Sequence, residues 1–214
     1  MSCCALLLTP RSLILWVGIL LSMWNGTMAH CEGIQKQMSP QLSSMHQHYI
    51  AAYRFQSAGD LVQAISEHRL FLVDALHNLA NGRANIGDYT QAARLYESAL
   101  KLADKDFVLY LDYAGAALDA GDPATANRLA QTALSINRNE VKPPEWAQAH
   151  LVLGRALRAT GKYNEALEEY KAAAAIDPNF ENTFALGTAY LWIPDTKSAA
   201  RQFEMLIARF GDTA

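Results

Sequence analysis

The sequence predicts an all-α fold, a solenoid of about five helix-turn-helix repeats. Three observations support this prediction. A complete unit can be read at residues 147–180, and glycine turns divide the chain at intervals close to the length of that unit. The composition is 51% hydrophobic and 18% charged, with much alanine, which suits closely packed helices rather than a disordered chain. Solenoids of this kind mostly bind other proteins.

The N-terminal segment, residues 1–29, differs in composition from the rest of the chain. Arg11 is its only charge, and its apolar run of about twelve residues ends at Trp24, short of the roughly 20 residues that span a bilayer. Small residues at Thr27 and Ala29 suit signal peptidase, so we expect a secretory signal cleaved after Ala29. The alternatives are an uncleaved membrane anchor and a buried N-terminal helix. The expected location is exported, either periplasmic or extracellular, and membrane-anchored if the segment is retained.

Residues 30–44 are expected to form a lead-in, with Ser39 as the N-cap of a helix that starts at Pro40. After cleavage Cys31 would be the only cysteine, which leaves no partner for an intrachain disulfide. Bacterial lipoproteins carry a small residue before the lipidated cysteine, whereas this chain has His30, so we do not expect lipidation.

The repeat array is predicted over residues 45–214. Glycine supplies the backbone freedom of a tight turn, and a following aspartate accepts hydrogen bonds from the free amides of the next helix. Gly59-Asp60, Gly87-Asp88 and Gly121-Asp122 follow this pattern, and Gly161-Lys162 marks a further turn. The predicted repeats are residues 45–72, 73–106, 107–140, 147–180 and 180–214.

The spacing between these glycines predicts two irregularities. The interval from Gly59 to Gly87 is shorter than the repeat unit by six positions, which leaves no room for a normal loop. We therefore expect one long helix, or two helices joined by a tight kink, over residues 61–85. The interval from Gly121 to Gly161 is longer than the unit by six positions, and we place the insertion in a longer loop at 140–145, where a double proline interrupts helix.

The fourth repeat resembles the tetratricopeptide-repeat family. The residues that carry the resemblance are Leu153, Gly154, Leu157, Gly161, Ala166, Tyr170, Ala173 and Pro178. The resemblance extends over most of the chain after the N-terminal segment, although the first and fifth repeats match weakly. His150 occupies the family's tryptophan position, and the family's proline occurs only as Pro178. The resemblance implies a right-handed superhelix that acts in protein–protein interaction.

The resemblance also implies a concave groove lined by the first helix of each repeat. The candidate ligand-binding residues are Tyr49, Tyr53, His77, Asn81, Asn85, Arg155, Arg158 and Trp192, with Leu111, Leu118, Leu151 and Phe184 at neighbouring groove positions. Asparagines four residues apart can bond the backbone of an extended peptide, and two arginines a turn apart can hold a carboxylate. Aromatic side chains can hold apolar anchors.

The chaperone-binding subtype of the family is not expected. It holds a C-terminal carboxylate with lysine, arginine and asparagine side chains, whereas the corresponding positions here include Tyr49, Tyr53, Leu111 and Gly115, and only Asn81 fits.

Enzymatic, metal and nucleic-acid functions have little support. The net charge of −3 offers no basic field for nucleic acid. The sequence has no nucleophile elbow, zinc-spaced cluster or phosphate-binding loop, and His46 and His48 would point to different faces of a helix. We therefore predict a protein that is not an enzyme and that needs no cofactor or metal.

The predicted function is a scaffold or adaptor that binds a peptide or protein in the groove outside the cytoplasm, most simply in a bacterial envelope. At the C-terminal end, an apolar stripe has no neighbour in the sequence: Phe203, Leu206, Ile207 and Phe210. Two alternatives follow, a binding or regulatory part of a longer multidomain protein, or a structural subunit that self-associates through this stripe.

Overall fold

The structure is a computed structural model that describes residues 40–136, 139 and 141–211. The predicted signal, its cleavage site and the three cysteines lie outside the described residues. The helices are α2 (Pro40–Ser57), α3 (Leu61–Asn85), α4 (Tyr89–Leu100), α5 (Phe107–Asp119), α6 (Pro123–Ser135), α7 (Pro143–Ala159), α8 (Tyr163–Ile176), α9 (Phe180–Trp192) and α10 (Thr196–Phe210).

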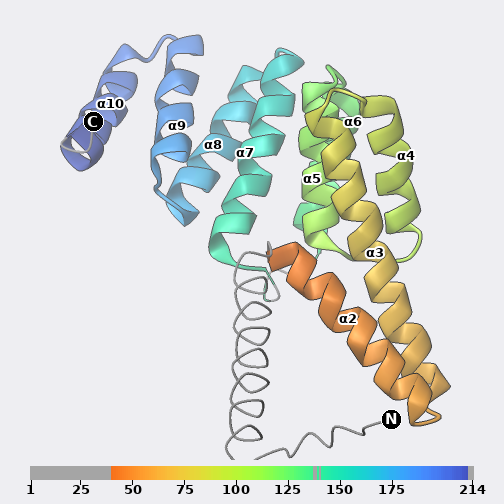
Figure 1. The fold of residues 1–214 in the computed structure, drawn as a ribbon. Coiled ribbons are helices and arrows are strands. Elements are labelled where there is room, and N and C mark those ends of the chain that lie inside the picture. The colour runs from red at the N-terminus through yellow and green to blue at the C-terminus, as the bar shows by residue number, and fades with distance from the viewer. Residues whose placement is uncertain (1–39, 137–138, 140, 212–214) are drawn as a thin grey trace, which may run out of the picture.

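Neighbouring helices pair as hairpins, and the hairpins stack side by side along the chain (Figure 1). The part of the chain that the structure describes contains no strand. The predicted all-α helical-repeat solenoid is therefore confirmed. Within the same ranges, no helix combines the length and the apolar character needed to cross a membrane.

The predicted turns are confirmed by the backbone. The φ angles are 81° at Gly59, 79° at Gly87, 77° at Gly121 and 78° at Gly161. This is the left-handed region, which glycine adopts easily and residues with a Cβ atom rarely adopt. An aspartate caps the helix after three of these turns, at Asp60, Asp88 and Asp122. In each case a carboxylate oxygen accepts a hydrogen bond from the backbone amide three residues later. Lys162 occupies the same position before α8 and makes no side-chain cap bond.

Helix α3 confirms the prediction of a long helix over residues 61–85. Its 25 residues run without interruption, so the second helix of the first hairpin continues directly into the first helix of the next. The consequence is visible in Figure 1, where α2 and the first half of α3 project below the other hairpins.

The prediction of a loop at residues 140–145 is partly wrong. Pro143 and Pro144 begin helix α7 instead of preceding it, with Lys142 as the N-cap. Proline is compatible with the first helical turn because the amide it lacks has no intrahelical partner there. The inserted residues thus lengthen α7 to 17 residues, and Trp146 in its first turn stacks on Phe107 of α5 at 5.6 Å between ring centroids.

Small residues allow the two helices of a hairpin to approach closely. A Cβ atom on Gly154 would lie 2.9 Å from the ring of Tyr170, and one on Gly187 would lie 2.9 Å from the ring of Phe203. Each aromatic ring therefore packs directly on the backbone of the partner helix, and the core of the fourth hairpin is built around Tyr170, which is 1% exposed.

The C-terminal stripe differs from the prediction. Leu206 is buried, and Phe203 and Phe210 are half-buried against Phe184 and Phe180 of α9. These three residues therefore belong largely to the α9–α10 hairpin, because α10 presents its apolar face to α9. Ile207 alone of the four is strongly exposed.

The hairpins α2–α3 and α7–α8 are separated by three full repeat periods, because the shortened and lengthened intervals cancel. His48 of α2 contacts Glu67 of α3 at 2.7 Å, and His150 of α7 contacts Glu169 of α8 at 2.7 Å, in each case between Nδ1 and Oε2. Both pairs are 19 residues apart in sequence. Equivalent positions of the two hairpins can therefore be compared one by one.

Candidate functional site: the inner groove

The first helices of successive hairpins line a groove. The second half of α3 contacts α5, α5 contacts α7, and α7 contacts α9. Two adjoining cavities follow these helices, one of about 350 Å³ between α3, α5 and α7 and one of about 570 Å³ between α5, α7 and α9. Because both are lined by Gly115, Asp119, Gln148 and Val152, we treat them as one feature, the inner groove.

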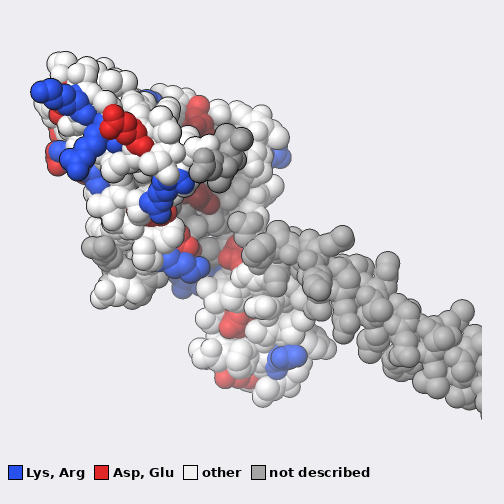
Figure 2. Space-filling model, turned by 90° about the vertical axis from the view of Figure 1, so that its left-hand side faces the viewer, with Lys and Arg blue, Asp and Glu red and all other residues white. Residues whose placement is uncertain are grey.

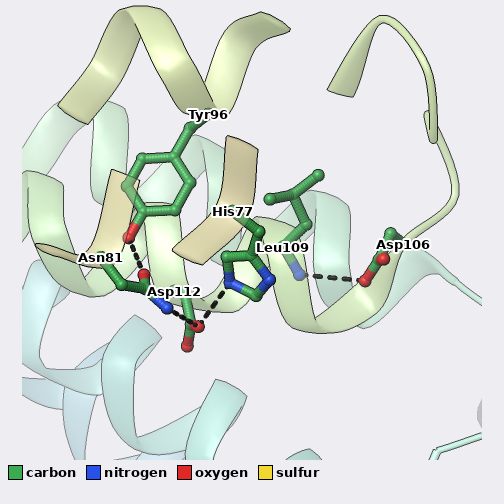
Figure 3. A network of polar contacts seen from close by, with 6 residues as sticks. All are labelled: His77, Asn81, Tyr96, Asp106, Leu109 and Asp112. Carbon is green, nitrogen blue, oxygen red and sulfur yellow. Dashed lines mark hydrogen bonds and ion pairs between the residues drawn. The ribbon is translucent and has the colours of Figure 1, made fainter. Parts of the chain in front are cut away.

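A polar network fixes the α3 end of the inner groove (Figure 3). The Asp112 Oδ2 atom lies 2.7 Å from His77 Nε2 and accepts a hydrogen bond from Asn81 Nδ2 at 3.2 Å. The Asn81 Oδ1 atom in turn accepts a hydrogen bond from the Tyr96 hydroxyl. Asp112 is placed for this role by α5, whose first turn is capped by Asp106.

The network holds Tyr96 as a neutral hydrogen-bond donor. Burial, and to a lesser extent the Asp112 carboxylate, raises the pKa of Tyr96 above its ordinary value. The Tyr96 ring also stacks on Tyr113 at 5.0 Å. His77 and Asn81 therefore act mainly to join α3 to α5, and a ligand would meet the Asp112 carboxylate beside them.

The middle of the inner groove carries polar side chains that are free to bind. Asn85, Asp119 and Gln148 line it and form no side-chain hydrogen bond or ion pair with other residues of the described ranges. Gly115 leaves open space beside them, since a Cβ atom there would have no neighbour within 4 Å. Amide side chains offer both donors and acceptors to a peptide backbone.

The α9 end of the inner groove is basic and aromatic. Arg155 Nη2 pairs with Glu181 Oε1 at 2.5 Å, and both side chains are substantially exposed. The Arg158 guanidinium lies over the Trp192 ring, 5.1 Å from its centroid. Phe184 lines the same end. A ligand carboxylate that binds Arg155 would share or replace its contact with Glu181.

The structure brings together most of the residues that the sequence suggested for the groove. Those that line it are Asn81, Asn85, Leu111, Leu118, Arg155, Arg158, Phe184 and Trp192. His77 lies behind Asp112, and Leu151 is buried in the core. Tyr49 and Tyr53 are exposed on α2 and do not line the groove, because the uninterrupted α3 carries that hairpin away from the array.

The sequence analysis missed several polar lining residues, among them Asp112, Asp119 and Gln148. A signal existed for Asp119, which follows Asn85 by one full repeat period and so occupies the same repeat position. Asp112 and Gln148 carry no comparable signal, since their place in the groove depends on how neighbouring hairpins pack. Among the described residues, no group of three His, Cys, Asp or Glu side chains could hold a metal ion.

Comparison with protein families identifies the repeat type. Residues 154–191 match the model described as TPR repeat, and residues 75–107 match that of the tetratricopeptide repeat. A comparison with curated proteins found no match.

Several solved structures share this fold. MamA (residues 41 to the end) from Desulfovibrio magneticus RS-1 is 19% identical with a TM-score of 0.57, and the match covers 77% of this chain and 94% of that one. YrrB, described as a TPR protein with an unusual peptide-binding site, is 20% identical, with a TM-score of 0.53 and coverages of 73% and 81%. The first TPR of Spaghetti (RPAP3), bound to the HSP90 peptide SRMEEVD, is 24% identical, with a TM-score of 0.52 and coverages of 57% and 93%.

At these identities the similarity concerns the fold. Residues 75–107 and 154–191 thus match repeats of the tetratricopeptide type, and the chain shares the fold of proteins built from such repeats.

Proposed function

We propose that this protein is a scaffold that binds an extended peptide or protein segment in the inner groove. The observation that carries the proposal is a set of polar side chains, Asn85, Asp119 and Gln148, that have no partner within the described ranges and lie between two ends of different character. One end presents the Asp112 carboxylate, and the other presents Arg158 on Trp192. Two of the similar structures, YrrB and Spaghetti, are described with a peptide-binding site or a bound peptide.

The mechanism is binding to a preformed surface. The groove side chains sit on helices, and the Asp112 network and the Arg155–Glu181 pair hold the two ends in place. A rigid receptor loses little conformational entropy on binding, so the ordering cost falls mainly on the peptide. Amides in the middle of the groove can bond any backbone, while the ends select side chains.

A peptide selection tests this proposal. Peptides selected from a random display library on the full chain would be measured by calorimetry against Asn85→Ala, Gln148→Ala and Arg158→Ala. We expect each variant to weaken binding at least fivefold, since each removes a hydrogen-bonding or cation–π partner. Gln131→Ala on the exposed side of α6 is the matched control and should bind as the parent does. If the selected peptides bind all three groove variants with the affinity of the parent protein, the binding site lies outside the inner groove.

We further propose that the protein acts outside the cytoplasm, where it is periplasmic or extracellular. The support is the apolar run from Leu13 to Trp24 followed by small residues at Thr27 and Ala29. Mass spectrometry of the exported protein should find His30 as its first residue. An intact N-terminus on a membrane-bound product would favour an uncleaved anchor instead.

A further inference from the structure

Helix α3 carries an apolar stripe that the described helices leave open. It consists of Leu61, Val62, Ile65, Leu72 and Leu79, which are 46% to 76% exposed. The spacing of Ile65, Leu72 and Leu79 is the seven-residue interval of a heptad. Apolar residues at this interval form a continuous seam that packs against a second long helix. Helices α2 and α4 both pack against α3, and in Figure 1 they lie on different sides of it. We call these five residues the α3 stripe.

The equivalent hairpin α7–α8 explains why the stripe is open. Ile65, which is 68% exposed, corresponds to Leu167, which is 8% exposed. After α8 the chain turns and α9 packs back against α8, whereas α3 continues straight to Asn85. The first half of α3 therefore lacks the antiparallel helix that follows a regular repeat.

Helix α4 does not replace this missing neighbour. The Arg69 guanidinium donates a hydrogen bond to the carbonyl oxygen of Leu102, just after α4 ends. The end of α4 thus lies at the level of Arg69, and Leu61, Val62 and Ile65 extend beyond it. On the side shown in Figure 2, the lobe that projects at the bottom, formed by α2 and the start of α3, carries acidic and basic side chains scattered among uncharged ones.

We propose that a second copy of this chain covers the α3 stripe, with the two α3 helices packed antiparallel. The charges at the two ends of α3 favour a second copy in this direction. Asp60 precedes the helix, and Arg83, which also pairs with Asp88 at 3.5 Å, lies near its end. Antiparallel packing brings the Asp60 end of each copy beside the Arg83 end of the other. Parallel packing would align like charges and like helix dipoles. An antiparallel pair also has the two-fold symmetry that is commonest in homodimers.

The dimer leaves the inner groove free. Asn81 follows Leu79 by two positions, so at about 3.6 residues per turn the two side chains point to nearly opposite sides of α3. Each dimer would therefore present two grooves. The stripe is about 27 Å long, and one helix pair of this length buries less than the roughly 1,600 Å² of a standard interface. We expect a reversible dimer with a dissociation constant on the order of 10 μM.

Sedimentation of the full chain from about 1 to about 300 μM tests the proposal. The parent protein should pass from monomer to dimer over this range. Ile65→Lys and Leu72→Lys, made separately, should each raise the dissociation constant at least tenfold, because each buries a charge in an apolar seam. Ile207→Lys is the matched control, since Ile207 is 71% exposed on α10, and it should leave the equilibrium unchanged. Unchanged helical circular dichroism would show that the variants fold.

Cysteine cross-linking tests the direction of packing. In a chain with Cys3, Cys4 and Cys31 replaced by serine, Leu72→Cys should form a disulfide dimer, because the two copies of a residue near the middle of an antiparallel seam face each other. Leu61→Cys, at one end, should not. A parent protein that stays monomeric would overturn the proposal, and so would a dimer that persists in both lysine variants or is lost in Ile207→Lys. Cross-linking at Leu61 instead of Leu72 would also overturn it.

Discussion

Hairpins α2–α3 and α7–α8 follow the same local pattern and are buried to very different degrees. Each has a glycine turn and an interhelical His–Glu contact of 2.7 Å at the same spacing. Yet Leu151 of α7 is fully buried, while its equivalent Tyr49 in α2 is 55% exposed. The local sequence pattern therefore forms a hairpin in both places. Only the α7–α8 hairpin is buried by neighbouring hairpins on both sides.

The difference has a simple origin in chain length. The fourth hairpin is followed by a turn that returns the chain as α9, so its outer positions are covered. The first hairpin has a shorter interval before the next glycine turn, and its second helix extends as α3 instead. Burial in a solenoid depends on neighbours, so the loss of one turn exposes apolar positions that the same pattern buries elsewhere.

The largest expected effect concerns Tyr170, a large side chain that is almost fully buried in the fourth hairpin. Tyr170→Ala should reduce the free energy of unfolding by about 3–4 kcal/mol, since the ring fills the space above Gly154 and its loss leaves a cavity. The equivalent residue in the first hairpin is the exposed His68, and His68→Ala should change stability by less than about 0.5 kcal/mol. Urea unfolding of the two variants measures both values. Equal losses would mean that the two hairpins are packed alike.

A smaller effect tests whether the His–Glu contacts are equivalent. Glu67→Ala and Glu169→Ala should each cost about 1 kcal/mol, because both contacts are half-buried and have the same geometry. Double-mutant cycles with His48→Ala and His150→Ala give the coupling energy of each pair. A coupling present in the fourth hairpin and absent in the first would show that the contact depends on the surrounding array.

The smallest effect concerns the helix N-caps, because the first hairpin has a side-chain cap that the fourth hairpin lacks. Asp60 caps α3, whereas Lys162 gives α8 no side-chain cap. Lys162→Asp should raise the free energy of unfolding at pH 7 by about 0.5 kcal/mol, the gain of a cap reduced by the loss of the exposed contact between Lys162 and Glu165. Thermal unfolding at several pH values measures this gain.

The stability gained in Lys162→Asp should depend on pH, and the direction of that dependence can be derived. At the comparable cap of α6, hydrogen bonds from Thr125, first from its amide, lower the pKa of Asp122 below its ordinary value. A carboxylate with a lowered folded-state pKa stabilises the fold above its unfolded-state pKa, and the stabilisation is lost as the pH falls through the folded-state pKa. Lys162→Asp should lose its advantage in strong acid. Lys162→Asn, a neutral cap, should keep it, and equal behaviour of the two would exclude a charge effect.

The repeat spacing predicted much of the fold, and the family resemblance predicted part of the site. The interval from Gly59 to Gly87 predicted either the long α3 or two helices joined by a tight kink, because a helix-turn-helix unit with a normal loop cannot close within so short a segment. The double proline at Pro143 and Pro144 was ambiguous, since proline both interrupts a helix and starts one, and its role depends on the tertiary contacts of α7. The groove positions on α5, α7 and α9 followed from the resemblance to the tetratricopeptide-repeat family, which did not predict the contacts of Arg155 and Arg158.

The helices, their turns and the order of the hairpins can be predicted from the sequence, because glycine turns, aspartate caps and apolar spacing act over a few residues. Which of the equivalent positions are buried depends on the tertiary structure. Ile65 and Leu167 occupy the same place in two hairpins with the same local pattern, and one is open while the other is covered. The physical reason is that burial depends on surfaces supplied by other hairpins, whose presence beside a given helix depends on where the chain turns.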